Sequence, residues 1–236
     1  MSRASAVLAL VLLVALAPSA GAAKSSPTDR YVHPHFADFQ VRSVAVLPVA
    51  VRHAADQASE TMSRQLERGI TSVGYRWIST SMLRTSLGTP ERSGEIDQLV
   101  ERLRRTGALD TTSVRAFGAA AEVDAVLATL VTTWERETID LTMTGQSMTQ
   151  IGLQAYLYSA KSGELLWARR FLVKGEGPYN NPSEGSNLLG VSSSGLQTAA
   201  PRTTTSLDPP SYEEVAAKLA GQLRDALPPP PKPATP

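Results

Sequence analysis

The stretch VRSVAVLPVAV, Val41–Val51, has the composition of a buried strand. It is β-branched and apolar on both faces around residues 44–47, which is typical of a strand buried on both sides. Pro48 has no N–H to give to a neighbouring strand, so we expect it at the strand's end or at a bulge, before a loop that starts at Arg52. The sequence therefore predicts a central strand of an α/β domain.

Helical and strand periods follow one another after this strand. Apolar residues at steps of three or four predict amphipathic helices, two of which stop at Gly74 and Gly107. Alternating apolar residues on both sides of a turn at residues 159–163 predict an antiparallel hairpin. In order, the predicted elements are a helix over 56–73, a strand over 75–79, helices starting near 80, 95 and 111, strands over 126–137, 151–158 and 165–171, and a closing helix.

This order predicts the fold class: an α/β, single-domain sandwich with a mixed sheet and an antiparallel hairpin, helices packed on the sheet, and a disordered loop and tail. The predicted segments are a signal peptide over 1–22, an extended lead-in over 23–40, the α/β domain over 41–227 with its closing helix over 211–227, and a Pro-rich tail over 228–236.

Two segments are rich in residues that do not build a core. Residues 175–210 contain mostly Gly, Ser, Asn, Thr and Pro, and we expect them to form a long loop or linker. The final PPPPKPATP predicts an extended polyproline tail. Its role is open between docking to a partner and a simple unstructured end.

The amino-terminal run AVLALVLLVALA, Ala6–Ala17, follows Arg3 and is as long as a signal-peptide core of about 7 to 15 residues. It is shorter than the ~20 residues that cross a bilayer. Pro18 ends the run, and the small residues after it predict cleavage after Ala22 or Ala23. An uncleaved anchor stays open as the alternative.

Charge and cysteine content narrow the function classes. The chain has 23 Lys and Arg against 22 Asp and Glu, and the leader contains one of the basic residues, so the mature chain is formally neutral. Without a basic block, we expect no nucleic-acid partner. The absence of cysteine excludes disulfides, thiolate metal sites, thiol nucleophiles and lipid attachment through an amino-terminal cysteine. Together with the leader, these features predict an exported protein of the periplasm or the outer-membrane periphery.

Candidate catalytic and metal-binding groups are scattered. His33, His35 and His53 lie in the lead-in and a loop, whereas zinc ligands sit on rigid elements, so we expect exposed histidines and no metal. Glu135 and Glu137 share a strand face, but polar neighbours indicate a solvated strand end. The sequence therefore predicts no catalytic residues and no cofactor.

Two glycine-containing motifs also do not predict a catalytic or phosphate-binding site. SSSG, Ser192–Gly195, lies in the loop-like segment and not at a strand-to-helix turn, as a hydrolase nucleophile would require. GEGPYN, Gly175–Asn180, has no following Lys-Ser or Lys-Thr and no helix start, so it does not predict a phosphate cradle.

Several stretches resemble a family. SVAVLPVAV, the helix ending in VGYRWIS, FGAAAEVDAVLATLVTTW and LQAYLYSAKSGELLWARRF are similar to a group of bacterial envelope proteins. The group includes lipoproteins typified by the curli secretion channel subunit, the activator lipoproteins of penicillin-binding proteins, and the amino-terminal domain of TolB. The resemblance covers about residues 41–174 and implies a scaffold. TIDLTMTGQSMT is too short and polar for the transmembrane hairpin of secretion-channel subunits, which argues against pore formation.

Two function classes follow. The first is a non-catalytic envelope protein, an accessory or assembly factor of an envelope or secretion complex, which binds another envelope protein or itself as an oligomer. Its mature chain has no membrane span, and peripheral membrane association is open. The alternative is a periplasmic enzyme or metal-binding protein with a site built from dispersed residues. For the first class, the aromatic residues expected at the partner surface are Trp134, Tyr156, Tyr158 and Tyr179.

Overall fold

The structure is a computed structural model that describes residues 29–53, 56–87, 90–140, 142–180 and 207–231. The predicted signal peptide with its cleavage sites at Ala22 and Ala23 lies outside the described residues. So do residues 181–206 of the predicted loop and the last part of the Pro-rich tail. Pro228 and Pro230 of the tail are described: Tyr75 donates its hydroxyl proton to the Pro228 carbonyl at 2.6 Å.

From residue 41 onward, helices and strands follow the predicted order, whereas a short strand and a 3-10 helix lie in the segment that was predicted to be an extended lead-in. Along the chain the elements are β1 (Arg30–Val32), the 3-10 helix η1 (Phe36–Phe39), β2 (Ser43–Val46), β3 (Ala50–Val51), α1 (Asp56–Ile70), β4 (Arg76–Ile78), α2 (Thr80–Leu87), α3 (Pro90–Thr106), α4 (Thr111–Ala121), β5 (Ala125–Glu137), β6 (Gly145–Ser159), β7 (Leu165–Asn180) and α5 (Tyr212–Ala226).

Within the described residues, seven strands form one mixed sheet in the order β1-β7-β6-β5-β2-β4, with β3 beside β5. β2 pairs in parallel with β4 and β5, and β3 pairs in parallel with β5. The strands β5, β6, β7 and β1 are antiparallel to one another. The predicted mixed sheet with an antiparallel hairpin is confirmed.

The stretch Val41–Val51 forms two strands instead of one. Leu47 still donates its N–H to the Leu127 carbonyl at 3.0 Å, and Arg52 donates to the Val131 carbonyl at 3.1 Å, so the break lies between these two bonds. Pro48 lies at this break, as its missing N–H predicts. β2 is buried along its whole length between β4 and β5, which confirms its central position.

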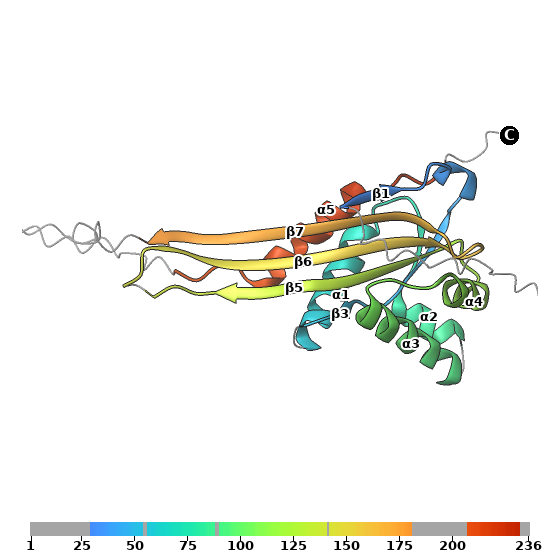
Figure 1. Cartoon of the computed structure of the whole chain (residues 1–236), viewed down its shortest axis with the longest axis horizontal. Helices are drawn as coiled ribbons and strands as arrows, with labels where there is room; N and C mark the ends of the chain where they lie inside the picture. The colour runs from blue at the N-terminus through green and yellow to red at the C-terminus, as the bar shows by residue number, and fades with distance from the viewer. Residues whose placement is uncertain (1–28, 54–55, 88–89, 141, 181–206, 232–236) are drawn as a thin grey trace, which may run out of the picture.

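Helices cover both faces of the sheet, as Figure 1 shows: α1 and α5 lie behind it, and α2, α3 and α4 lie in front. The first core joins one sheet face to α1 and α5 through residues such as Met62, Leu66 and Leu219. The second joins the other face to α2, α3 and α4 through residues such as Leu83 and Phe117. Burial of both faces explains the continuous apolar composition of β2.

Asp124 joins the start of β2 to the start of β5 by hydrogen bonds. Its carboxylate accepts hydrogen bonds from the Arg42 N–H at 3.0 Å, the Ser43 N–H at 2.8 Å and the Ser43 hydroxyl at 2.8 Å. Burial acts to raise the pKa of Asp124, but these bonds outweigh it and hold the pKa below its usual value. The aspartate of the DAVL stretch therefore has a structural role in the sheet.

The strands β5, β6 and β7 are longer than predicted and extend beyond the helices α2, α3 and α4 (Figure 1). Gly175–Asn180 continues β7, so the prediction that the loop starts at residue 175 is wrong. Residues 145–150, which were expected in a connection, begin β6. Their polar and glycine-rich composition hid both strand segments, because alternation of apolar residues was the signal for a strand.

Candidate functional site

The extended part of β5, β6 and β7 has one covered and one uncovered face. We call residues 132–137, 145–154 and 170–180 the ribbon. On the covered face, Trp134 stacks on Tyr212 with ring centroids 4.6 Å apart. Thr149 donates its hydroxyl proton to the Pro210 carbonyl at 2.6 Å. The segment before α5, and the start of α5 itself, therefore close this side of the ribbon.

Two glycines of β7 allow α5 and the segment before it to pack closely on the ribbon. A Cβ atom on Gly175 would lie 2.8 Å from Cγ2 of Val215 and 3.1 Å from Cγ of Pro210. A Cβ atom on Gly177 would lie 3.2 Å from the Asp208 carbonyl oxygen. Side chains at these positions would push α5 and its preceding segment away from β7.

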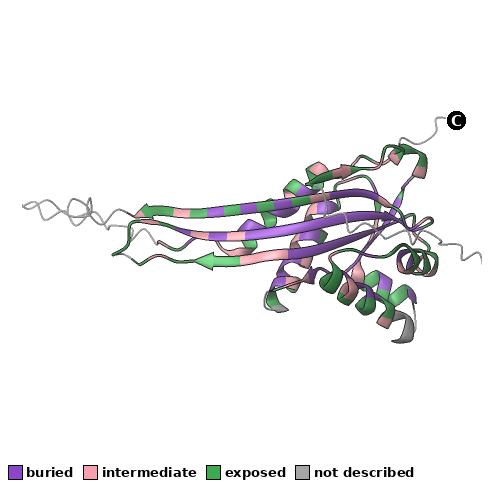
Figure 2. Cartoon of the chain, in the orientation of Figure 1, coloured by how far each residue is buried: buried purple, intermediate pink, exposed green. Residues whose placement is uncertain are grey.

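The opposite face of the ribbon has no described helix over it. Residues that lie directly opposite one another in an antiparallel pair share a face, so the strand register defines this surface. We call it the uncovered face; its residues are Thr133, Glu135 and Glu137 of β5, Met148, Gln150 and Gly152 of β6, and Arg170, Leu172, Lys174 and Glu176 of β7. Figure 2 shows the resulting alternation of buried and exposed residues along β7.

Leu172 is the apolar side chain that stands out on the uncovered face, with 55% of its surface exposed. It lies opposite Gly152, which has no side chain to cover it. The Thr132 and Thr133 side chains fill the space over Gly152, since a Cβ atom there would lie 2.9 Å from each hydroxyl oxygen. Leu172 itself is therefore the apolar contact point that this face offers to a partner.

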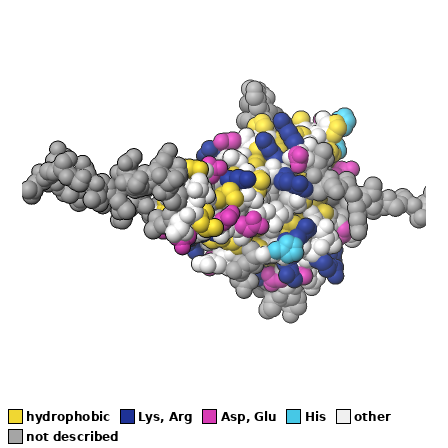
Figure 3. All heavy atoms as spheres, turned by 60° about the vertical axis from the view of Figure 1, so that its left-hand side comes forward, with side chains coloured by type: hydrophobic (Ala, Val, Ile, Leu, Met, Phe, Trp, Pro, Cys, Tyr) yellow, Lys and Arg dark blue, Asp and Glu magenta, His cyan; other side chains and the backbone are white. Residues whose placement is uncertain are grey.

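Charges on the uncovered face differ between its two outer strands. Glu135, Gln150 and Lys174 lie in one row across the ribbon, so an acidic group on β5 and a basic group on β7 flank a neutral centre. Within the described residues, neither Glu135 nor Lys174 takes part in an ion pair. Figure 3, which turns the strand tips forward, shows acidic, basic and apolar side chains mixed, without a large patch of one charge.

Both outer edges of the ribbon lack a neighbouring strand in the part of the chain that the structure describes. β3 pairs with β5 up to Val131, and β1 pairs with β7 at residues 167–169. Beyond these points the N–H and C=O groups on the outer edges of β5 and β7 have no strand to bind. Such edges are templates for strand addition.

Two of the residues predicted at a partner surface are buried. Tyr156 and Tyr158 retain 3% and 4% exposure, so the expectation that they lie at the surface is wrong. They point into the core between the sheet and the helices α3 and α4. The Tyr158 hydroxyl accepts a hydrogen bond from the Leu109 N–H at 3.1 Å, and the Tyr156 hydroxyl donates to Gln154 at 2.8 Å.

The other two predicted residues lie on the ribbon. Trp134 is half-buried, because Tyr212 covers its ring on the α5 side. Tyr179 lies near the tip of β7 with 62% of its surface exposed. A contact of either residue with a partner stays a prediction. Sequence reasoning missed Leu172 and Lys174, because nothing in the local sequence indicates which sheet face a helix leaves open.

The candidate metal-binding and acid–base residues lie as separate side chains. His33 contacts the ring of Phe39 edge-on at 5.1 Å, and His35 lies 3.4 Å from the Asp38 carboxylate. Among the described residues, no group of three or more His, Cys, Asp or Glu side chains is placed to hold a metal ion. Glu135 and Glu137 are exposed at the strand end, as predicted.

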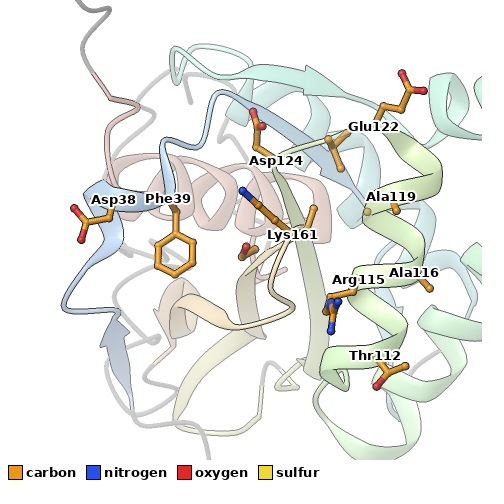
Figure 4. Close-up of a pocket in the computed structure, with 13 residues that line it drawn as sticks. Asp38, Phe39, Thr112, Arg115, Ala116, Ala119, Glu122, Asp124 and Lys161 are labelled. Carbon is orange, nitrogen blue, oxygen red and sulfur yellow. The ribbon is translucent and has the colours of Figure 1, made fainter.

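A hollow of about 990 Å³ lies between η1, α4 and the turn from β6 to β7. Figure 4 shows Lys161 reaching toward Asp124 there, while Asp38 and Glu122 point away. Asp124 already accepts its three hydrogen bonds from β2, and the Ser159 hydroxyl accepts the Ser162 N–H at 3.1 Å. The hydrogen bonds of Asp124 and Ser159 at the hollow thus join β2 to β5 and close the turn from β6 to β7.

No helix in the described part of the chain is long and apolar enough to span a membrane. No family model and no curated protein sequence matches the chain.

Several solved structures are similar to it. The lipoprotein GNA1162 from Neisseria meningitidis is 16% identical, with a TM-score of 0.41 over 63% of this chain and 92% of that one. The PelC dodecamer from Paraburkholderia phytofirmans is 12% identical, with a TM-score of 0.43 over 80% and 88%. The LpoB C-terminal domain from Salmonella enterica is 17% identical, with a TM-score of 0.31 over 56% and 82%.

Lipoproteins are among the similar structures. The resemblance to the curli channel subunit and to TolB stays a prediction. At these identities and scores, function has to be derived from the chain's own residues.

Proposed function

We propose that this chain is an exported, non-catalytic protein of the bacterial cell envelope that binds a partner protein through the ribbon, as an accessory or assembly factor. The observation that carries the proposal is the ribbon itself. Three strands project beyond the helices with one face uncovered and both outer edges unpaired among the described residues. Monomeric proteins normally shorten, charge or cover such edges, whereas binding proteins use them for strand addition.

The charge pattern supports a protein partner over other ligands. The uncovered face carries charges of both signs together with neutral residues, whereas nucleic acids and anionic lipids bind positively charged surfaces. Export is supported by the leader-like segment, and the lack of cysteine leaves the chain without disulfides and without a lipid on an amino-terminal cysteine. The periplasm or the periphery of the outer membrane is the compartment that fits both features.

A non-catalytic role is supported by the hollow beside α4. Its charged side chains Arg115, Glu122 and Lys161 are exposed, and its serine is bonded to a main-chain N–H. A general base needs a proton donor within hydrogen-bond reach. The carboxylate of Asp124, which lines the hollow, is instead engaged in structural hydrogen bonds with Arg42 and Ser43 at the start of β2.

Site-specific photocrosslinking in intact cells tests the proposal. A photoreactive amino acid replaces Leu172 on the ribbon or Met82 on α2, which are matched in exposure at 55% and 58%. We expect a defined crosslinked species from position 172 and none from position 82. Equal crosslinking from both positions, or none from position 172, would contradict the proposal.

A further inference from the structure

The outer edge of β7 has a defined hydrogen-bonding direction. Near the base of the strand, His33 donates its N–H to the Leu166 carbonyl at 2.7 Å, and Arg170 donates its N–H to the Asp29 carbonyl at 3.2 Å. Even-numbered residues of β7 therefore direct their main-chain groups outward. The register with β6 is continuous from residue 170 to residue 176, so this alternation holds over that span.

Three residues continue the edge beyond β1. Leu172, Lys174 and Glu176 direct their N–H and C=O groups outward, and no described strand accepts them. The same three side chains lie on the uncovered face. The available edge has two limits, because Arg170 is already bonded to Asp29 and Pro178 has no N–H. Gly175 lies midway between Leu172 and Pro178.

This edge is complementary to itself in one register. An antiparallel pairing centred on Gly175 places Lys174 directly opposite Glu176 of a second copy, and Glu176 opposite the second Lys174. Each such pair exchanges both of its main-chain hydrogen bonds and brings opposite charges together on one face. A shift that centres the pairing on residue 174 or 176 places like charges opposite each other. A shift to residue 173 brings in Arg170, whose N–H is taken.

We propose that two copies of this chain join their sheets through the outer edges of β7, around a twofold axis at Gly175. This inference rests on the proposed function and names a second copy of the chain as the partner of the ribbon. Because the interface is the same patch on both copies, the pairing closes at two and hides the two β7 edges from further strand addition.

Engineered disulfides test the register. The chain contains no cysteine, so any disulfide comes from the introduced residues. Hydrogen-bonded residues of an antiparallel pair have Cα atoms about 5.5 Å apart, which a disulfide can bridge. The variant with both Lys174→Cys and Glu176→Cys should form a covalent dimer on mild oxidation of the full chain. The variant with Leu172→Cys and Lys174→Cys is the control, because these positions face each other only in the register centred on residue 173. Equal dimer yields would overturn the inference.

Charge exchange tests the contact without a covalent bond. Lys174→Glu and Glu176→Lys each place like charges opposite each other, so each should weaken dimerisation about tenfold or more. The double variant exchanges both charges and should restore the wild-type dissociation constant, measured by sedimentation over a series of concentrations. Failure of the double variant to restore dimerisation would contradict the proposed pairing.

The inference and the proposed function fail in different ways. If the wild-type chain stays monomeric at all concentrations while position 172 crosslinks to another protein in cells, the self-pairing is overturned and the proposed function stands. If position 172 crosslinks to nothing, both are overturned.

Discussion

Trp134 of β5 and Tyr212 of α5 stack with their ring planes 12° apart. This contact joins residues 78 positions apart in the sequence and lies on the covered face of the ribbon, at the start of α5. It ties the base of the ribbon to the helix behind it, so the geometry of the uncovered face depends on the covered one.

The stacked pair should couple energetically. In a double-mutant cycle with Trp134→Ala and Tyr212→Ala, we expect a coupling free energy of about 0.5 to 1.5 kcal/mol beyond the loss of buried area. Urea unfolding of the four proteins measures it. Tyr212→Phe keeps the ring and serves as the control, with a loss below that of Tyr212→Ala. Strictly additive effects would show that the stacking does not stabilise the domain.

Two helical glycines should respond to alanine in opposite directions. A Cβ atom on Gly118 of α4 would lie 2.4 Å from Cβ of Ala160 in the turn from β6 to β7, whereas nothing lies within 4 Å of a Cβ atom on Gly221 of α5. Gly118→Ala should lower the free energy of unfolding by about 1 to 3 kcal/mol. Gly221→Ala should raise it by up to about 1 kcal/mol. Thermal and urea unfolding distinguish the two, and a neutral Gly118→Ala would mean that α4 does not press on the turn.

Asp110 should make α4 sensitive to acid. The main-chain N–H of Ser113 and the Arg102 side chain hold the pKa of Asp110 at about 2, below its usual 3.8. Because the folded-state pKa is lowered, the stabilisation is complete above pH ~4 and is lost as the pH falls toward ~2. Asp110→Ala should cost about 1 kcal/mol at neutral pH through the lost helix cap.

The variant Asp110→Asn is the control for the acid dependence of Asp110. Asp110→Asn keeps a capping oxygen but does not titrate, so its stability should fall less than that of the wild type between pH ~4 and ~2. Urea unfolding at several pH values measures this. Identical acid profiles for the wild type and Asp110→Asn would be inconsistent with the low pKa.

Tyr158 should stabilise the fold through a buried hydrogen bond, and its titration should make the stability fall at alkaline pH. Tyr158→Phe removes the acceptor of the Leu109 N–H, which then stays buried without a partner, at a cost of about 1 to 3 kcal/mol. Burial also raises the pKa of Tyr158 above the usual value of 10.0. The folded state therefore holds the proton longer, and its stability is complete below pH ~10 and falls as the pH rises above it.

Urea unfolding measured from neutral to alkaline pH checks the direction of this change. The free energy of unfolding should fall less with rising pH in Tyr158→Phe than in the wild type. An equal loss in both proteins would mean that other groups, such as Tyr75 with a pKa raised to about 12, account for it.

The sequence predicts the mixed sheet, the central β2 and the hairpin of β6 and β7, because each depends on local periodicity. The ribbon was harder to predict, since residues 145–150 and 175–180 are polar or glycine-rich and form strands through distant contacts. Thr149, for example, binds Pro210, which lies 61 residues further along the chain. Tyr156 and Tyr158 were misplaced because alternation identifies which residues share a face and does not show whether helices cover it.

Hydrogen exchange of single amides in β7 shows whether a partner binds along the outer edge of this strand. Val173 directs its N–H toward β6, whereas Lys174 and Glu176 direct theirs toward the open edge, so Val173 is an internal control in the same strand. In dilute, unassembled protein, we predict slow exchange at Val173 and fast exchange at Lys174 and Glu176. In the assembled protein, the latter two should become protected as well. Unchanged fast exchange at Lys174 and Glu176 after assembly would contradict binding through this edge.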